Sequence, residues 1–281
     1  MSDFDLYKEL LEAKRVGQSV LLATVVRTAG SVPRHAGSKM LVGAGGAILA
    51  GTIGGGEMEN RVLERVAEVI AGGQPELLHY DLVDPTEGDP GVCGGQMEIF
   101  LEPIMPDPTV LVVGCGHVGQ ALADLAKWVG FRVIVSDDRA DLCSPENIPG
   151  ADDYLVCPSA ELVQRATIHA QTYIASVTRG VPFDVAMLPA LLETDAPYIG
   201  VLGSRRRWAT TVQELKEQGV SEESLTRVHA PIGLELEAET PREIAVSIIA
   251  EIIAQQKHGT GKAMKWPGAA TTTDVPPPGD D

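Results

Sequence analysis

The chain has 281 residues, and at roughly 100 to 200 residues per domain this length suggests two domains. Its composition, 44% hydrophobic and 22% charged residues, is that of an ordinary soluble globular protein, and 4% aromatic residues argue against a stacking surface for single-stranded nucleic acid. The formal net charge of −17 at pH 7 repels phosphate backbones and anionic lipids. We therefore expect no nucleic acid or membrane partner, and any anionic ligand requires a local basic pocket.

The N-terminus and the cysteines indicate a cellular compartment. Residues 1–15 are acidic and amphipathic, unlike a signal peptide, and no apolar run approaches ~18 residues. The four cysteines are widely separated and form no C-x-x-C pair, which argues against a zinc ribbon or a disulfide framework. We therefore expect a cytoplasmic protein whose cysteines are reduced thiols.

Residues 1–104 are predicted to form a small α+β domain. In chain order, apolar spacing predicts a helix over 4–15, a strand over 19–27, a hairpin over 38–50, a helix over 57–73, and strands over 76–82 and 96–104. Three prolines in PIMPDPT, residues 103–109, interrupt regular structure and predict a linker.

Strand and helix patterns alternate over residues 109–258, which is typical of a Rossmann-like doubly wound parallel sheet with helices on both faces. The last helix is predicted to begin at Pro241, with Thr240 as its N-cap. Residues 259–281 show no periodicity, so we expect a disordered tail. The predicted fold class is α/β, with the Rossmann-like domain following the smaller α+β domain.

A glycine turn is predicted after the first strand of the second domain. Gly114, Gly116 and Gly119 form G-x-G-x-x-G between a strand and a helix, so backbone N–H groups and His117 at the helix start face any phosphate bound there. Asp137 ends the next strand, where a carboxylate accepts hydrogen bonds from a ribose hydroxyl. NAD(P) or another nucleotide is one occupant, and a scaffold that has lost its nucleotide is the alternative.

A basic loop over residues 27–40 contains Arg27, Arg34 and Lys39 and no acidic residue, in a strongly acidic protein. Together with Ser31, these side chains predict a phosphate site; a solvated loop that pairs with the acidic surface is the alternative.

Two further glycine clusters lie in the first domain. Gly54, Gly55 and Gly56 precede a helix and expose its N-terminus, so we expect a ligand to approach the backbone, with Glu57 facing it. Glu59 is expected only to favour the helix dipole.

The second cluster surrounds Cys93, which is followed by Gly94, Gly95 and Gln96. An accessible thiol among glycines is suited to bind a soft metal or to carry sulfur, and a structural cysteine is the alternative.

Together these segments resemble the XdhC/CoxI family, the accessory factors of molybdenum hydroxylases such as xanthine dehydrogenase. The resemblance runs from about residue 17 to residue 258. The blocks that carry it, in the family's order, are ATVVRTAGSVPRHAGSKM, GTIGGGEMEN, CGGQMEIFLEP, VVGCGHVGQALA with SDDR, YIGVLGSRRR, and HAPIGLELEAETPREIAVSIIAEI.

The resemblance implies a chaperone more than a catalyst. It implies a protein that binds molybdenum cofactor, assists its sulfuration, and inserts it into the apoenzyme of a molybdenum hydroxylase, with a cysteine desulfurase as the sulfur donor. The phosphate of molybdopterin suits the basic loop, and the thiophilic molybdenum suits Cys93 as its ligand or sulfur carrier. Many relatives have a cysteine where this chain has Glu57, so sulfur transfer through that position is excluded here.

Ser204 and Arg205 follow a predicted strand at the carboxyl edge of the Rossmann sheet, so they are candidates for the same site, with surface ion pairing as the alternative. We expect the ligand in a cleft between this edge and the N-terminal domain.

Several alternatives stay open. They are molybdopterin or its dinucleotide form as the ligand, an NAD-dependent oxidoreductase, and a nucleotide or redox sensor that regulates hydroxylase assembly. A homodimer is plausible for a chaperone of dimeric enzymes, but no sequence pattern establishes one.

Overall fold

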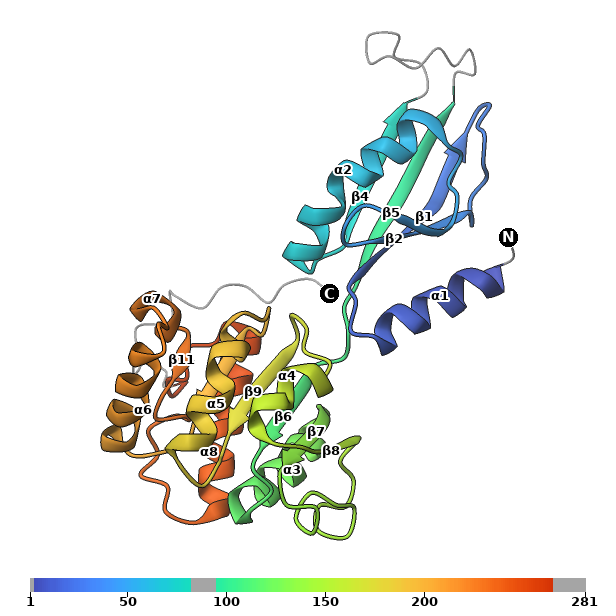
Figure 1. Cartoon of the computed structure of the whole chain (residues 1–281). Coiled ribbons are helices and arrows are strands. Elements are labelled where there is room, and N and C mark those ends of the chain that lie inside the picture. The colour runs from blue at the N-terminus through green and yellow to red at the C-terminus, as the bar shows by residue number, and fades with distance from the viewer. Residues whose placement is uncertain (1–2, 82–94, 265–281) are drawn as a thin grey trace, which may run out of the picture.

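The computed structural model describes residues 3–81 and 95–264, which form two separate sheets (Figure 1). The first sheet is antiparallel, with the strand order β3-β2-β1-β5-β4. Its strands are β1 (Val20–Ala29), β2 (Lys39–Gly43), β3 (Ile48–Gly51), β4 (Glu76–Asp81) and β5 (Gln96–Ile104). Two helices accompany it, α1 (Asp3–Arg15) and α2 (Gly56–Gly72).

The two faces of strand β1 explain how these helices pack. Side chains alternate between the two faces of a strand. Leu21, Ala23 and Val25 therefore pack in one cluster with α2, whereas Val20 and Leu22 pack in another with α1. Helix α2 ends at a glycine in the left-handed conformation, Gly73, whose N–H donates to the last carbonyls of the helix.

The second sheet is wholly parallel, with the strand order β11-β10-β9-β6-β7-β8. Its strands are β6 (Thr109–Val113), β7 (Arg132–Asp137), β8 (Asp153–Val156), β9 (Thr172–Ser176), β10 (Tyr198–Val201) and β11 (Val228–His229). Counted from β6, this is the order 3-2-1-4-5-6 of dinucleotide-binding folds. The strand order therefore reverses between β6 and β9, which is where such folds bind ligands.

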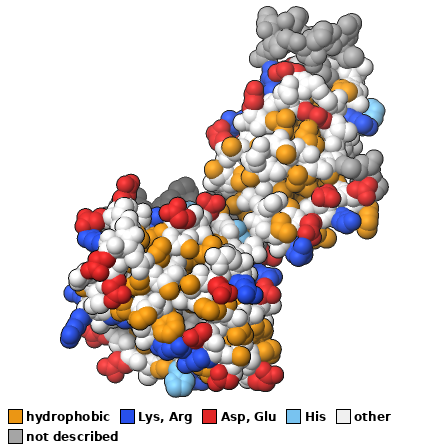
Figure 2. Space-filling model, in the orientation of Figure 1, with side chains coloured by type: hydrophobic (Ala, Val, Ile, Leu, Met, Phe, Trp, Pro, Cys, Tyr) orange, Lys and Arg blue, Asp and Glu red, His pale blue; other side chains and the backbone are white. Residues whose placement is uncertain are grey.

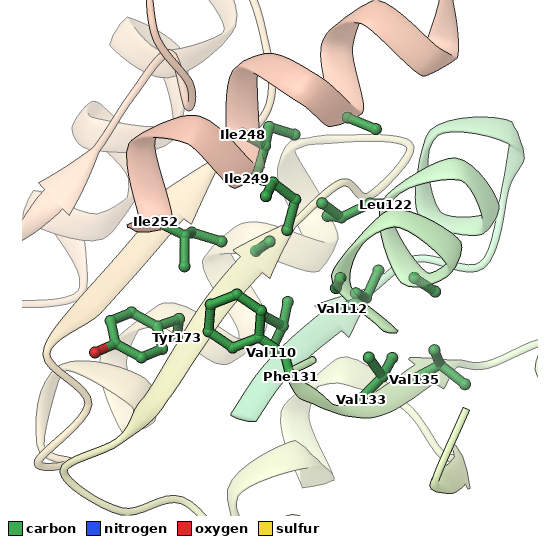
Figure 3. Packing of buried hydrophobic residues seen from close by; sticks show 14 of the residues in the cluster. Val110, Val112, Leu122, Phe131, Val133, Val135, Tyr173, Ile248, Ile249 and Ile252 are labelled. Atoms are coloured by element: carbon green, nitrogen blue, oxygen red, sulfur yellow. The ribbon is translucent and has the colours of Figure 1, made fainter. Parts of the chain in front are cut away.

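Helices cover both faces of the parallel sheet. One face carries α3 (His117–Val129) and α8 (Pro241–Lys257), whose side chains meet those of the strands in a buried cluster that includes Leu122 and Ile248 (Figure 3). The other face carries α4 (Leu162–Arg165), α5 (Val181–Leu192), α6 (Arg205–Glu217) and α7 (Glu222–Leu225), with a short 3-10 turn at Ser159–Glu161. Burial on both faces explains why β6 is apolar at every position after Thr109.

The predicted α/β fold class is confirmed, and the hairpin predicted over residues 38–50 is formed by β2 and β3. The connection between β8 and β9 is a 3-10 turn, Ser159–Glu161, followed by one turn of α-helix, Leu162–Arg165. The two sheets are formed by consecutive stretches of the chain. We keep the domain boundary predicted at residues 103–109 as a proposal. No described helix is both long enough and apolar enough to cross a bilayer.

The two sheets meet at the amino edge of the parallel sheet. The side chain of Lys14, in the last turn of α1, lies 2.8 Å from the carboxylate of Asp107, just before β6. A pocket of about 410 Å³ at this junction is lined by residues of α1 together with Thr109 and Arg132, the first residues of β6 and β7. The carboxyl edge of the sheet therefore faces away from the first sheet (Figure 1).

Candidate functional site

A pocket of about 210 Å³ lies at the carboxyl edge of the parallel sheet, where the strand order reverses. It is lined by the segments that follow β6, β7, β8 and β9, including Gly114, Gly116, Asp138 and Arg179. This is the position at which open α/β sheets bind nucleotides. The pocket therefore contains most of the residues predicted from the glycine turn.

The three glycines of the turn have different physical reasons to be glycine. A side chain on Gly114, which has a φ of +109°, would place its Cβ 2.7 Å from the carbonyl oxygen of Val177. A Cβ on Gly119 would lie 1.9 Å from the carbonyl oxygen of Gly114. Gly116 differs, because its φ of −75° suits any residue and a Cβ there would point into open space. Packing thus explains two of the glycines, whereas no contact within the described chain requires a glycine at position 116.

The N-terminus of α3 is open to this pocket. Its N-cap is Gly116, so no side chain caps the helix, and the first turn contains no acidic residue. The exposed His117 is the first helical residue. Uncapped N–H groups and the helix dipole together favour an anion at this end.

Asp137 holds the glycine turn in place. Its carboxylate, 4% exposed, accepts hydrogen bonds from the N–H of Cys115 at 2.8 Å and from the backbone and guanidinium of Arg139 at 2.9 to 3.0 Å. Burial opposes its ionisation, but these hydrogen bonds outweigh burial and keep the pKa of Asp137 well below its usual value. Both oxygens are thus engaged within the chain, which leaves Asp137 poorly placed for the ribose contact predicted from the sequence.

The carboxylate that remains exposed beside the pocket is that of Asp138. The guanidinium of Arg179 donates to it in a bidentate arrangement at 2.8 and 3.1 Å, and the same guanidinium lies 4.2 Å from the ring centre of Phe183. Sequence reasoning missed Arg179 and Phe183, since both follow β9 and have no motif.

A second buried carboxylate, Asp184, joins the neighbouring segments of the same edge. It accepts hydrogen bonds from Ser176 at 2.9 Å, Thr178 at 2.8 Å and Arg207 at 2.6 Å. Ser204 caps helix α6 by accepting from the N–H of Arg207 at 3.2 Å, whereas Arg205 is exposed and has no ion pair with any described residue. Of the three consecutive arginines, Arg207 therefore stabilises the edge, and Arg205 is available to a ligand.

The N-terminal glycine clusters converge at one end of the antiparallel sheet. A Cβ on Gly54 would lie 2.8 Å from the side chain of Pro33, and a Cβ on Gly95 would lie 2.2 Å from the carbonyl oxygen of Ser31. The exposed Gln96 pairs in register with Ala29 at the end of β1. The three segments predicted to form one site are thus adjacent. Cys93 and Gly94 lie outside the described residues.

The glycine run before α2 is closed by a carboxylate from the same chain. Glu59 accepts hydrogen bonds from the hydroxyl of Thr52 at 2.6 Å and from the N–H groups of Ile53 at 3.2 Å and Gly55 at 3.0 Å. Burial opposes its ionisation, but these bonds lower the pKa of Glu59. Glu59 therefore holds the loop in place, in addition to the dipole effect expected from the sequence. Gly56 is the most exposed glycine of the run.

The basic loop presents its cations separately. Arg27 is 76% exposed and lies 3.8 Å from Glu98, while the ammonium of Lys39 donates to the carbonyl oxygen of Gly37. Arg34 is exposed and has no ion pair within the described part of the chain. On the face shown in Figure 2, lysines and arginines are scattered among acidic residues. Arg34 is thus the cation of this loop most free to bind a ligand.

A further pocket of about 500 Å³ lies beside the glycine run, between α2 and β4. Glu57, Arg61, His79 and Tyr80 are among its lining residues, and the Arg61 guanidinium lies 5.0 Å from the centre of the Tyr80 ring. Of these residues, only Glu57 was predicted from the sequence. The others face one another from a helix and a strand, and no short stretch of sequence indicates that contact.

The predicted cleft between the first domain and the carboxyl edge of the Rossmann sheet is not formed within one chain, and this expectation was wrong. Val20, at the start of β1, pairs with Ile104 beside the linker, so the glycine clusters at the other end of β1 lie far from the linker. The glycine turn lies beyond the other edge of the parallel sheet (Figure 1). The candidate residues therefore form two groups at opposite ends of the molecule.

Metal ligands are sparse in the described part of the chain. Among residues 3–81 and 95–264, no three His, Cys, Asp or Glu side chains are grouped as a metal site. Cys115, Cys143 and Cys157 are free and buried. The three thiols are thus little exposed, and Cys157 lies at the wall of the carboxyl-edge pocket.

We expect Asp137→Asn to change how the free energy of unfolding depends on pH in the acid range. Because folding lowers the pKa of Asp137, its ionised carboxylate stabilises the fold above the unfolded value of about 3.9, and the contribution is lost as the pH falls further. Urea unfolding from about pH 7 to pH 3 should show wild type losing more stability than Asp137→Asn below about pH 5. Asp138→Asn, at a more exposed carboxylate, should change this profile less. Parallel profiles for wild type and Asp137→Asn would contradict the assigned role.

Comparison with known proteins places this architecture in a family. A model described as the XdhC Rossmann domain matches residues 110–252, and one described as the XdhC and CoxI family matches residues 13–81. The chain is similar to "Uncharacterized protein YqeB" of Escherichia coli (strain K12), with 32% identity over 268 residues, covering 94% of this chain and 48% of that protein.

Two further relatives carry functional names. A probable xanthine dehydrogenase subunit of Bacillus subtilis (strain 168) is 30% identical over 160 residues, 57% of this chain and 46% of that protein. "Molybdenum cofactor insertion chaperone PaoD" of Escherichia coli (strain K12) is 24% identical over 280 residues, 88% of this chain and 87% of that protein. The chain spans about half the length of the first two relatives.

Among solved structures, a xanthine dehydrogenase from Bacillus halodurans aligns with a TM-score of 0.49 and 22% identity, over 92% of this chain and 96% of that one. The family matches cover β1 to β4 of the first sheet and nearly all of the second, and the Rossmann match spans the glycine turn and its pocket. The chain belongs to the XdhC and CoxI family.

Proposed function

We propose that the chain binds molybdenum cofactor and inserts it into the apoenzyme of a molybdenum hydroxylase of the xanthine dehydrogenase class. One observation carries the binding step: Gly116 opens an uncapped helix N-terminus to a pocket at the nucleotide-binding position of the fold. A phosphate or nucleotide end of the cofactor fits this position. The relatives named for cofactor insertion and for xanthine dehydrogenase support the choice of cargo and recipient.

We assign the second group of residues to the sulfuration of the cofactor. A cysteine desulfurase would supply sulfur as a persulfide, and a thiol is the group that accepts it. Glu57 cannot accept sulfur, and the three described cysteines are buried, so Cys93 is the remaining candidate. Arg34, on the loop whose Ser31 lies against Gly95, is proposed to bind the phosphate of molybdopterin. Exchange with both partners would take place in the cytoplasm.

The opposite positions of the two groups favour a homodimer. One cofactor molecule cannot reach both Arg34 and the turn at Gly116 in the same chain, because the two sheets lie between them (Figure 1). In a dimer, the N-terminal group of one copy can meet the carboxyl edge of the other. The dinucleotide form of the cofactor would then occupy both groups.

The position of the pocket also favours a second candidate, a nucleotide-binding protein that uses NAD(P). A hydride-transfer enzyme requires a proton donor near the nicotinamide. The charged residues lining this pocket, Asp137, Asp138, Arg139 and Arg179, are paired with one another. This pairing supports a sensor more than a dehydrogenase. Fluorescence of acid-oxidised pterin from the purified protein tests the chaperone, and bound NAD(P) without pterin would favour the sensor.

We predict that Arg34→Ala lowers the affinity for molybdopterin by about 1.5 to 3 kcal/mol, because a charge-assisted pair with the phosphate is lost. Equilibrium dialysis with fluorescent detection of the pterin measures the change. Arg165→Ala, which removes an exposed arginine paired with Glu161, is the matched control and should bind as wild type. Equal affinities for Arg34→Ala and wild type would place the phosphate elsewhere.

We predict that Gly116→Val reduces affinity for the pterin dinucleotide or NAD(P) at least tenfold, since the new side chain fills the approach to the turn. Its unfolding temperature should stay within a few degrees of wild type, because the backbone suits valine. Gly119→Ala should lower the unfolding temperature instead, because its Cβ meets a carbonyl oxygen. Unchanged binding by folded Gly116→Val would mean that the turn serves only as scaffold.

We predict that Cys93→Ala retains the fold and abolishes activation of a recipient hydroxylase that depends on sulfurated cofactor. Activation is measured by the hydroxylase activity recovered after incubation with cofactor, cysteine desulfurase and cysteine. Cys143→Ala, at a buried thiol, controls for the general loss of a cysteine and should activate normally. Full activation by Cys93→Ala would remove this thiol from the pathway.

A further inference from the structure

One segment at the carboxyl edge does not contribute to the site described above. It consists of residues 235–246, which are the segment before α8 and the first turns of that helix, and we call it the acidic spur. Three residues before the spur, Ile232 donates its N–H to Val201 at the end of β10, so the chain leaves the sheet at its carboxyl edge. Helices of a doubly wound sheet begin at this edge, and α8 packs beside α3, whose first turn faces the ligand pocket. The spur therefore lies on the same edge as the glycine turn.

The base of the spur is held firmly. Gly233 donates its N–H to Glu251 at 2.6 Å, and Leu234 and Ser247 exchange two hydrogen bonds at 2.5 and 3.2 Å. Thr240 and Glu243 form a reciprocal capping box at the start of α8. These bonds fix the segment against the helix, so its surface is formed before any partner arrives.

A groove with both apolar and charged lining residues runs along the spur. Its volume is about 540 Å³, and Leu236, Ala238 and Val246 line it. Leu236 is 52% exposed and Val246 is 49% exposed, so both project from the surface of a tightly packed unit. Covering such side chains with a partner is favourable by roughly 25 cal/mol for each square ångström of apolar surface.

The rim of the groove is acidic and not neutralised. It carries Glu237, Glu239 and Glu243 against one arginine, Arg242, and Glu235 precedes it. Glu235, Glu237 and Glu239 form no ion pair with residues 3–81 or 95–264, so no neighbouring cation of the described chain neutralises them. An apolar floor inside an unpaired acidic rim complements a segment with an apolar anchor between basic residues.

We infer that the acidic spur is the docking surface for a basic, apolar-anchored segment of the apoenzyme that receives the cofactor. The inference rests on the proposed function, and it adds the surface and the chemistry by which the recipient is recognised. Docking on this edge would bring the recipient beside the pocket that opens at Gly116, so the cargo has a short path to its acceptor.

Three purified variants of the full chain test this assignment. Leu236→Ser with Val246→Ser removes the apolar floor, and Glu235→Lys with Glu237→Lys and Glu239→Lys reverses the rim. Glu193→Lys with Asp195→Lys and Glu223→Lys makes the same change of net charge at acids elsewhere on the unit. Each protein is loaded with pterin cofactor, its pterin content is measured by fluorescence, and its affinity for a purified apo xanthine dehydrogenase is measured at low and moderate salt.

The expected result is at least a tenfold loss of affinity for the apoenzyme in both spur variants, and less than a twofold change in the control variant. All proteins should retain pterin equally, and wild-type affinity should fall as salt rises. Wild-type affinity in the spur variants, or no binding of the apoenzyme by pterin-loaded wild type, would overturn the docking surface. A loss of affinity only for a purified cysteine desulfurase would also overturn it. Absence of pterin from wild type would instead contradict the proposed function.

Discussion

The carboxylate of Asp137 is the contact on which the carboxyl-edge site depends. It is buried at the end of β7, holds the N–H of Cys115 within the glycine turn, and is itself neutralised by Arg139. A carboxylate in this position in many nucleotide-binding folds faces the ribose. Here it fixes the backbone from behind, so the turn is formed without a ligand and Gly116 remains open toward the pocket.

The same device recurs in the first sheet. Glu59 binds N–H groups of the glycine run before α2 much as Asp137 binds the turn before α3. In both places an anion from the chain satisfies part of a backbone rich in unpaired donors and leaves the helix N-terminus beside it exposed. Two glycine-rich loops with little intrinsic rigidity are thus ordered by single side chains.

Local patterns predicted much of this structure, and non-local contacts account for what they missed. The alternating strands and helices, the glycine turn and the cap at Thr240 are properties of short windows, so they could be predicted. The ion pair between Asp184 and Arg207 joins two helices, and no short stretch of the sequence predicts it. The predicted cleft failed for a related reason. The placement of the two sheets depends on a short linker and contacts such as Lys14 with Asp107, which sequence periodicity does not encode.

The attachment of the first sheet at the amino edge determines how another protein can approach the pocket at the carboxyl edge. If the first sheet were folded over the glycine turn, a hinge would have to open before a large protein could reach a ligand bound there. Here the pocket at Gly116 is not covered by the first sheet of its own chain, and the first sheet lies on the opposite side of the parallel sheet. Within one chain the two groups of candidate residues therefore lie on separate faces, and it takes a second copy of the chain to bring an N-terminal group to a carboxyl edge.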